Sequence, residues 1–526
     1  MLLLAGAAHA ATCDDTSVSH DIAVSGWGVD EKNHRFIAEA AAGITRDNVG
    51  SLRLKWAFGL PDTNAPRFMP LISEDTVIVS DADGLVYALD RESGCEKWRF
   101  DAGSQVRTAF SYLGDGERHL VYFGTFGADL IALDLKTGRE VWRNNLADHP
   151  RAMLSGTGIE HEGVIYQPVS SWEVAWALNP FYACCTFRAS VVAVRADTGE
   201  QLWRAYTIEE QPKVVESRLL LPDHLGPSGA PAWSQPTVDA ARGLIYIGTG
   251  ENYSGPATDT SNAIIAFNMA SGEMAWKRQF LPGDIWNMAC EAPMHPNCPD
   301  RSGVDLDFGA PPVLVTLDER DYLLAGQKSA RVFALDPAEA GEPLWSYTAG
   351  AGGKAGGVHF AMAVDAARGA LYVPISDRPI ANLDDSSNGE PNPSLHALDI
   401  ATGKPLWEVA APGDCRDPDS KEGERLEDCY EGFSAAITVT DNLVFAPTLD
   451  GYLRAFDADT GEQVWAHDTR GDHPSVSNTE AYGGAIDYGG VFLGGGELFV
   501  SSGYGQFGQI PGNAFMVFSV AADTPR

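Results

Sequence analysis

Two acidic side chains stand beside segments that are predicted to be β-strands. Glu173 follows the run Val169-Ser170-Ser171, and Asp307 precedes the run Val313-Leu314-Val315. Hard carboxylate oxygens are the ligands that Ca²⁺ prefers. An aspartate beside such a cation stays ionised, so it can accept the proton of an alcohol hydroxyl. Taken alone, Asp307 is more simply a turn cap and Glu173 an exposed loop residue, so their context has to decide.

An isolated tryptophan and a pair of adjacent cysteines are the next candidates. Trp233 lies outside the tryptophan repeat described below, and an indole offers a large flat face at low entropic cost. A disulfide between the neighbours Cys184 and Cys185 would close an eight-membered ring. The alternatives are a tryptophan packed between sheets, and thiols that are reduced or separately bonded.

The charge balance excludes two classes of partner. The 526 residues carry 72 acidic and 37 basic side chains, a formal net charge of −35, and the sequence pI is about 4.5. Phosphate repels such a surface, so nucleic acid and anionic membranes are excluded as partners. Small neutral substrates and basic proteins remain open. An aromatic content of 10% excludes intrinsic disorder.

A repeated motif indicates the elements that must position these residues. A strand ending in Ala-Leu-Asp is followed by Ser/Thr-Gly and then by Trp, as in Ala132-Leu133-Asp134…Thr137-Gly138…Trp142. Asp-x-x-Thr-Gly is a tight turn in which Gly takes the positive φ, so it joins two antiparallel strands. Seven copies occur, with their tryptophans at Trp98, Trp142, Trp203, Trp276, Trp345, Trp407 and Trp465.

The two ends of the chain supply the eighth copy in halves. Phe515–Phe518 is a final strand with no Trp after it, whereas Leu52–Trp56 lacks a strand before it. Because one four-stranded blade cannot cover its own faces, the units must form a ring, and joining the halves hides both edges. We therefore expect an all-β, eight-bladed β-propeller closed by the N- and C-terminal strands. A ring of six or seven blades or a β-sandwich is the alternative.

The first residues and the cysteines indicate export. Residues 1–10 form a short apolar run ending in Ala8-His9-Ala10, which resembles a signal-peptidase site, although no basic segment precedes it. We expect residues 11–526 to form one propeller domain with no membrane-spanning segment. Eight cysteines suit an oxidising compartment, taken here as the periplasm. Spacing leaves connectivity open but suggests the pairs Cys290–Cys298, Cys415–Cys429, Cys184–Cys185 and Cys13–Cys95.

The tryptophan repeat resembles that of the alcohol dehydrogenases that depend on pyrroloquinoline quinone (PQQ), and the likeness spans nearly the whole chain after residue 10. Four segments resemble the polyvinyl-alcohol dehydrogenase branch of that family: Cys184–Arg188, Gly357–Phe360, Tyr372–Asp377 and Ser502–Gly508. The resemblance implies a propeller that binds PQQ and Ca²⁺ in a central funnel.

The same resemblance assigns the catalytic and metal-binding residues. Asp307, in Asp307-Phe308-Gly309-Ala310, matches the catalytic base and Glu173 a Ca²⁺ ligand. The family's third ligand is an Asn after Gly-Thr-Gly, where this chain has Glu251 and then Asn252, so either can take that role. Asp305 is expected to be a solvated neighbour. Lanthanide-using relatives carry a further Asp where this chain has Gly309, which favours Ca²⁺.

The remaining expected residues would contact the cofactor. Trp233 matches the floor on which PQQ stacks, and Lys328 the basic group at the reactive quinone oxygen. Arg107 would pair with one of the three PQQ carboxylates. Cys184 and Cys185 would lie over the cofactor by analogy with the methanol dehydrogenase branch. Pocket candidates of lower rank are Ser376, Asp377 and His359, and Tyr504, Gln506 and Phe507 are expected to line the rim of the last blade.

The expected activity is a periplasmic oxidation of alcohols, above all the secondary hydroxyls of polyvinyl alcohol or a related polymer. Hydride would pass to PQQ while Asp307 removes the hydroxyl proton. No CxxCH haem motif occurs in these residues, so a separate soluble cytochrome c would accept the electrons. The alternatives are the same chemistry on small alcohols, glycols or polyethers, and a non-catalytic propeller scaffold.

Overall fold

β-strands make up nearly all of the ordered elements. The computed structural model describes residues 12–114, 116–378, 389–416 and 424–521, and the predicted signal segment lies outside this part of the chain. The helices in the described residues are single turns: α1 (Glu39–Ala42), α2 (Glu173–Trp176), η1 (Val49–Ser51), η2 (Met288–Glu291), η3 (Pro337–Glu339) and η4 (Gly505–Phe507). None of them is long and apolar enough to cross a membrane.

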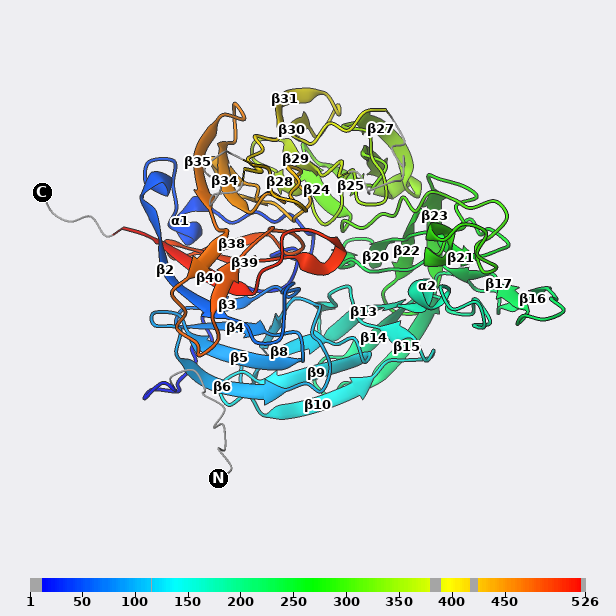
Figure 1. Cartoon of the computed structure of the whole chain (residues 1–526), viewed down its shortest axis with the longest axis horizontal. Helices are drawn as coiled ribbons and strands as arrows, with labels where there is room; N and C mark the ends of the chain where they lie inside the picture. Colours follow the sequence, from blue (N-terminus) through cyan, green and yellow to red (C-terminus); the bar gives the residue numbers. More distant parts are fainter. Residues whose placement is uncertain (1–11, 115, 379–388, 417–423, 522–526) are drawn as a thin grey trace, which may run out of the picture.

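Eight antiparallel sheets follow one another around a central axis, which confirms the predicted eight-bladed propeller (Figure 1). The first four blades are β3 (Leu71–Ser73), β4 (Thr76–Ser80), β5 (Leu85–Asp90) and β6 (Glu96–Asp101), with β1 (Ile22–Val24) added; β7 (Ser111–Gly114), β8 (His119–Gly124), β9 (Asp129–Asp134) and β10 (Glu140–Asn145); β11 (Ala152–Met153), β12 (Ile159–His161), β13 (Val164–Ser171), β14 (Ser190–Arg195) and β15 (Gln201–Tyr206); and β19 (Thr237–Asp239), β20 (Leu244–Gly248), β22 (Ala263–Asn268) and β23 (Met274–Gln279).

The other four blades complete the ring. They are β24 (Val313–Leu317), β25 (Arg320–Gly326), β26 (Arg331–Asp336) and β27 (Glu342–Thr348); β28 (Ala363–Asp365), β29 (Ala370–Ile375), β30 (Ser394–Asp399) and β31 (Pro405–Ala410); β32 (Thr438–Val439), β33 (Leu443–Phe445), β34 (Tyr452–Asp457) and β35 (Gln463–Asp468); and β38 (Val491–Gly494), β39 (Glu497–Ser502), β40 (Ala514–Val520) and β2 (Leu52–Gly59). Short two-stranded sheets lie between blades: β16 (Lys213–Glu216) with β17 (His224–Gly226), β18 (Ser228–Gly229) with β21 (Asn252–Ser254), and β36 (Gly471–His473) with β37 (Ala481–Gly483).

The repeated tryptophans join each blade to the next. The indole N–H of Trp142 donates to the carbonyl of Ala196 in the following blade at 3.0 Å. Its ring lies on Gly199, where φ is 74° and an added Cβ would come within 2.6 Å of the ring, so only glycine fits this turn. Five further tryptophans donate the same kind of hydrogen bond from the indole N–H to a backbone carbonyl: Trp56 to Arg91, Trp98 to Leu135, Trp203 to Met269, Trp345 to Ile400 and Trp407 to Ala458.

The chain ends close the ring as the sequence predicts. β2 pairs with β40 along its length, with Trp56 opposite Val517 and Phe58 opposite Phe515. Figure 1 shows this blue strand beside the orange and red strands β38–β40. β2 therefore completes the blade formed by β38, β39 and β40, so the two ends of the chain together supply one full sheet.

Residues 26–37 run across one end of the propeller. Backbone bonds join this segment to several blades, from Gly26 N–H to Phe110 O at 3.2 Å and from Ile37 N–H to Val439 O at 2.9 Å. Arg35, fully buried, donates to the carbonyls of Trp27 and Ile437 at 2.7 and 2.5 Å. Because these bonds satisfy the guanidinium away from water, the segment is fixed firmly across the axis.

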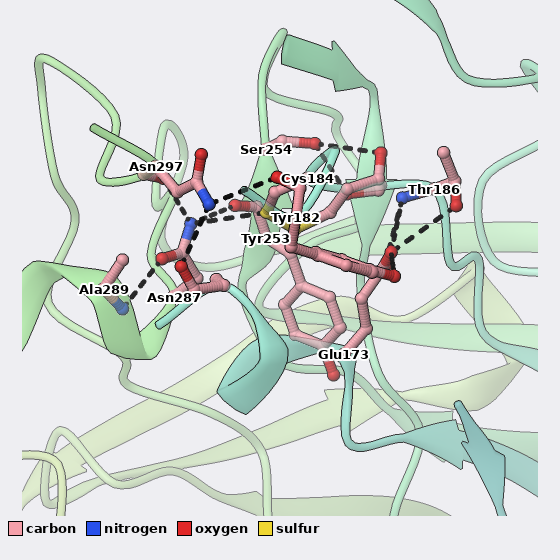
Figure 2. Close-up of a disulfide and its surroundings, with 12 residues drawn as sticks. Glu173, Tyr182, Cys184, Thr186, Tyr253, Ser254, Asn287, Ala289 and Asn297 are labelled. Carbon is pink, nitrogen blue, oxygen red and sulfur yellow. Dashed lines mark hydrogen bonds between the residues drawn. A yellow bond between two sulfur atoms is a disulfide. The ribbon is translucent and has the colours of Figure 1, made fainter. Parts of the chain in front are cut away.

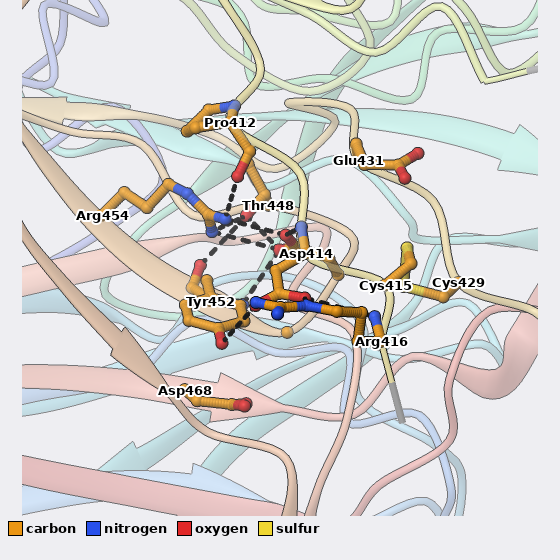
Figure 3. Close-up of polar contacts among 12 residues, drawn as sticks. Pro412, Asp414, Cys415, Arg416, Cys429, Glu431, Thr448, Tyr452, Arg454 and Asp468 are labelled. Atoms are coloured by element: carbon orange, nitrogen blue, oxygen red, sulfur yellow. Dashed lines mark hydrogen bonds and ion pairs between the residues drawn. A yellow bond between two sulfur atoms is a disulfide. The ribbon is translucent and has the colours of Figure 1, made fainter. Parts of the chain in front are cut away.

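Four disulfides account for all eight cysteines and match the suggested pairs, which are Cys13–Cys95, Cys184–Cys185, Cys290–Cys298 and Cys415–Cys429. Figure 3 shows polar anchoring beside the last of them. Asp414 accepts two hydrogen bonds from Arg416, at 2.8 and 2.9 Å, and its own N–H donates to Asp450 at 2.9 Å. Asp450 also pairs with the buried Arg454 at 2.8 Å. The connection before β32 is therefore tied to its blade.

Candidate active site

Loops from all parts of the ring converge on one cavity of about 440 Å³. One wall is acidic, with Glu251, Asp305 and Asp307 beside Lys328 and Trp233. A second group of lining residues, the arginine wall, contains Arg107 and Arg378 with Asp487 and Tyr504. A third group, the apolar wall, contains Met153, Trp172, Val174, Trp286 and Met288. Phe360 separates the cavity from residues 26–37, because its ring lies 6.3 Å from that of Trp27 and 6.1 Å from that of Trp233.

An ion pair with two carboxylates forms the centre of the acidic wall. Nζ of Lys328 lies 2.9 Å from Asp305 Oδ1 and 3.0 Å from Asp307 Oδ2, and all three side chains are buried. Burial opposes ionisation of Asp307, but the charge of Lys328 and the hydrogen bonds to Glu251, Lys328 and Trp233 together outweigh it, so the pKa of Asp307 is lowered. Burial likewise opposes the charge of Lys328, yet the two aspartates raise the pKa of Lys328 well above its ordinary value. Asp307 is thus an ionised carboxylate at neutral pH.

The structure corrects the expectation for Asp305. This residue was expected to be a solvated neighbour, but it is only 8% exposed and bonded to Lys328. Burial raises the pKa of Asp305 despite the nearby ammonium group. No pattern in the sequence distinguishes its side chain from that of a solvent-facing turn residue, since its burial depends on the loop before β24 folding inward.

Glu251 completes a group of three carboxylates. One oxygen each from Glu251, Asp305 and Asp307 lies within 4.8 Å of the others. Burial, then the charges of Asp307 and Asp305, raise the pKa of Glu251 well above its ordinary value. Its Oε2 has no hydrogen-bond partner among the described residues. A buried carboxylate oxygen without a donor, next to two further carboxylates, fits a hard cation such as Ca²⁺.

Trp233 is bonded to the acidic wall. Its indole N–H donates to Asp307 Oδ2 at 3.1 Å, and Nζ of Lys328 lies 5.7 Å from its ring centre. Two glycines allow this close packing. A Cβ on Gly309 would lie 2.2 Å from the Trp233 ring, and a Cβ on Gly250 would lie 2.4 Å from Asp307 Oδ1. A larger residue at position 309, such as the Asp of lanthanide-using relatives, would displace the indole.

Buried guanidinium nitrogens without a hydrogen-bond partner in the described part of the chain occur in the arginine wall and in Arg67, which neighbours Arg107. Nε of Arg107, Nε of Arg378, and Nε and Nη1 of Arg67 make no hydrogen bond to the described residues. Burial and the neighbouring charge of Arg107 lower the pKa of Arg67. Arg378 donates through Nη2 to Phe507 O at 2.5 Å, and Arg67 donates through Nη2 to Gln105 Oε1 at 3.1 Å. The buried nitrogens that still lack a partner are costly, so this wall fits a ligand with several carboxylates. Arg107 was expected from the sequence, whereas Arg67 and Arg378 were missed because nothing in the sequence signals their burial.

Two predicted metal ligands, Glu173 and Asn252, bond to other partners, and Figure 2 shows this for Glu173. The Glu173 carboxylate accepts bonds from Tyr182 Oη at 2.8 Å and from the backbone N–H groups of Thr186 and Phe187 at 2.9 and 2.7 Å. The amide of Asn252 donates to Ser228 O and accepts from Thr258 N–H. The structure therefore brings Glu251 and Asp307 together and does not bring Glu173 or Asn252 to them. A metal-binding role for Glu173 stays a prediction.

The adjacent cysteines are buried in an apolar cluster beside that carboxylate. Cys184 and Cys185 pack with Phe187 and Tyr253, and Figure 2 shows Cys184 beside Asn287 and Tyr253. Tyr253 is the member of this cluster that lines the cavity. Burial and the charge of Glu251 raise the pKa of Tyr253 well above its ordinary value. A direct role of the cysteine pair at the cofactor stays a prediction.

Ser376 and Asp377 shape a loop at the cavity wall. Ser376 Oγ donates to Ala355 O at 2.8 Å, and Ala355 lines the cavity. Asp377 accepts from the backbone N–H groups of Gly352 and Gly357 at 2.9 and 3.1 Å. Of the residues given a lower rank or expected at the rim of the last blade, His359, Tyr504 and Phe507 line the cavity. Burial lowers the pKa of His359 to about 3, so it is neutral.

Comparison with known proteins identifies one family over most of the chain. Residues 25–350 match the profile described as "Glucose/ethanol/alcohol dehydrogenase, beta-propeller domain". Residues 386–496 match that of "Outer membrane protein assembly factor BamB", a segment that contains neither Trp233 nor the acidic wall.

Curated relatives include two polyvinylalcohol dehydrogenases. That of a Pseudomonas species is 33% identical over 510 residues, which cover 94% of this chain and 76% of the relative, and that of Sphingopyxis sp. (strain 113P3) is 34% identical over the same shares. Among solved structures, the quinohemoprotein alcohol dehydrogenase of Comamonas testosteroni superposes with a TM-score of 0.65 at 19% identity, over 95% of this chain and 81% of the other. These findings show that the chain belongs to the family of PQQ-dependent alcohol dehydrogenases with a β-propeller fold.

Proposed function

We propose that this protein is an exported, PQQ- and Ca²⁺-dependent dehydrogenase that oxidises secondary hydroxyls of polyvinyl alcohol or a related compound to ketones. The observation that carries the proposal is the hydrogen-bonded group of Asp307, Lys328 and Trp233 in a cavity with an acidic and a cationic wall. The two relatives named as polyvinylalcohol dehydrogenases support the substrate class.

The residues of the cavity would hold both implied groups. Glu251, Asp305 and Asp307 would bind Ca²⁺, with Glu173 or Asn252 joining only if its present hydrogen bonds are exchanged for the ion. Trp233 would stack under the cofactor, and the unpaired arginine nitrogens would receive its carboxylates. When bound, PQQ supplies the acceptor for the hydride removed from the carbinol carbon, and Ca²⁺ supplies Lewis-acid polarisation.

Asp307 is the proposed base. Its carboxylate is ionised, and it accepts the hydroxyl proton while the C–H bond breaks, so a secondary alcohol leaves as a ketone. The Trp233 N–H and Lys328 Nζ both bond Oδ2 of Asp307, which fixes the carboxylate's orientation. Oδ1 accepts only a longer bond, of 3.3 Å, from the Glu251 N–H.

The apolar wall favours a substrate with aliphatic carbon on both sides of its hydroxyl. Trp172, Val174, Trp286 and Met288 line this wall and offer contact to methylene groups. Small secondary alcohols and glycols are the alternative substrates, because they need only the same wall and the same base.

Disulfides and charge support the proposed location and electron acceptor. Four disulfides suit the periplasm. A net charge of −35 would attract a basic soluble cytochrome c, which would take the two electrons one at a time.

Reconstitution tests the proposal. Apoprotein is titrated with PQQ in the presence and absence of Ca²⁺, and binding is followed by quenching of tryptophan fluorescence. A redox dye then reports turnover with primary, secondary and polymeric alcohols. We expect Ca²⁺-dependent quenching and fastest turnover on secondary hydroxyls. Absence of quenching would refute cofactor binding, and preference for primary alcohols would refute the substrate class.

A further inference from the structure

An apolar surface adjoins the mouth of the cavity. Its residues come from the end of α2 and the loop after it, from the tip of the β16–β17 hairpin and from the loop after η2. We call them the apolar rim: Trp176, Leu178, Phe181, Leu219, Leu220 and Met294. Their exposed fractions run from 41% for Trp176 to 100% for Met294. Large apolar side chains that stay exposed together commonly mark a binding surface.

The rim is continuous with the active-site cavity through α2. Trp172 and Val174 line the cavity, whereas Trp176 and Leu178 line a separate surface hollow of about 300 Å³ together with Ala175 and Asn179. The η2 turn packs against α2, and its first residue, Met288, also lines the cavity. A ligand that leaves the cavity along the apolar wall therefore meets the rim next.

The loops of the rim are held in place by one buried amide (Figure 2). Asn297 donates to the carbonyls of Ala177 and Asn179 at 3.0 and 2.9 Å, and its Oδ1 accepts from Arg218 in the β16–β17 hairpin at 3.1 Å. The neighbouring Cys290–Cys298 disulfide closes the third loop. Three separate segments are thus fixed against one another, which preorganises the surface.

Trp176 is itself preoriented. The guanidinium carbon of Arg151 lies 3.3 Å from its ring centre, and the ring of Tyr182 lies 6.3 Å away. The guanidinium group on one face holds the indole ring in one orientation. Little side-chain entropy is therefore lost when a ligand covers the remaining surface of the ring.

We propose that the apolar rim binds the chain of an uncharged, hydroxylated aliphatic polymer on one side of the hydroxyl being oxidised. This inference rests on the proposed function, because only a polymeric substrate extends beyond the cavity. A cavity of about 440 Å³ that also holds the cofactor cannot enclose a polymer chain. Methylene groups would contact the aromatic and aliphatic side chains, while hydroxyls would face Asn179 and water. The net charge of −35 excludes an anionic polymer.

The test compares the double variant W176A/F181A, and separately L219S/L220S at the hairpin tip, with wild-type holoenzyme. Leu406→Ala is the matched control, since this leucine is 53% exposed on β31 of another blade. A dye is the electron acceptor, and polyvinyl alcohol and 2,4-pentanediol are the substrates. We expect the KM for the polymer to rise about tenfold in each double variant, the factor that corresponds to 1.4 kcal/mol of lost contact. The kcat, and both constants for the diol, should stay as in wild type.

A binding measurement separates this inference from the proposed function. Native electrophoresis through gels containing polyvinyl alcohol should retard apoprotein, and the rim variants should lose that retardation while L406A keeps it. Retardation without any alcohol oxidation would overturn the proposed function alone. Unchanged retardation and polymer KM in both double variants would overturn the rim. If the rim variants transferred electrons more slowly to cytochrome c but kept the wild-type KM for the polymer, the rim proposal would also be overturned. The surface would then be assigned to binding of the electron acceptor.

Discussion

The indole N–H of Trp233 and the carboxylate of Asp307 are joined by a 3.1 Å hydrogen bond across 74 positions of sequence. The proposed cofactor shelf and the proposed base therefore share one geometry, so a shift of the ring moves the carboxylate. Lys328 bonds the same oxygen at 3.0 Å and leaves Oδ1 as the carboxylate's less engaged oxygen. This arrangement underlies the first three predictions.

Replacement of Asp307 by Asn should abolish turnover but retain the cofactor. The amide cannot accept the hydroxyl proton, and a positioned base commonly contributes about 10²- to 10⁴-fold to a rate. The measurement is kcat with a dye acceptor, alongside PQQ content by absorbance. Asp487→Asn, on the same cavity but away from Lys328, is the control and should keep most activity. A D307N enzyme with kcat near that of wild type would show that another group is the base.

Replacement of Glu251 by Gln should weaken Ca²⁺ binding about tenfold or more, because it removes a charged oxygen that has no other partner. Glu173→Gln should affect Ca²⁺ affinity less and thermal stability more, since Glu173 already receives bonds from Thr186 and Phe187. Isothermal titration of the apoproteins with Ca²⁺ measures the first effect and thermal unfolding the second. The reverse ranking of affinities would make Glu173 the principal ligand.

Replacement of Gly309 by Ala should weaken PQQ binding, because the new methyl group would sit 2.2 Å from a carbon of the Trp233 ring and push it aside. We expect a loss of roughly tenfold in affinity in the fluorescence titration. Gly50→Ala is a suitable control, since a Cβ there meets nothing within 4 Å. Equal PQQ affinities in both variants would mean that Trp233 is not the shelf.

Asp487 should make the apoprotein less stable as pH rises. Burial raises the pKa of Asp487 to about 6, above the value of about 3.9 expected in the unfolded chain. Between these values the folded state holds a proton that the unfolded state releases. Its contribution is thus fully present below about pH 4 and lost as pH rises through about 6, a change of about 3 kcal/mol.

Asp487→Asn removes this titration, so the variant should gain stability relative to wild type at about pH 7.5 but not at about pH 4. Urea unfolding of both apoproteins at the two pH values provides the measurement. A difference between the proteins that does not change with pH would contradict the assignment.

The sequence alone determined the ring. Asp-x-x-Thr-Gly turns and tryptophans such as Trp142 encode contacts that lie within one blade or to its neighbour, and the split copy at Leu52–Trp56 and Phe515–Phe518 requires closure. These are short-range rules of turn geometry and strand pairing, so a single sequence displays them. The family resemblance also brought Asp307, Lys328 and Trp233 to attention, and the structure places the three in direct contact.

Only the tertiary structure decided which polar side chains face the cavity. Asp305 and Glu251 turn inward to join Asp307, whereas Asn252 turns to Thr258 and Glu173 to the backbone of Thr186 and Phe187. Arg67 and Arg378 gain significance only because buried nitrogens of their guanidinium groups lack a hydrogen-bond partner among the residues that the structure describes. The cavity is assembled from loops of many blades, and the direction of each side chain depends on contacts with residues distant in sequence, for which no local pattern exists.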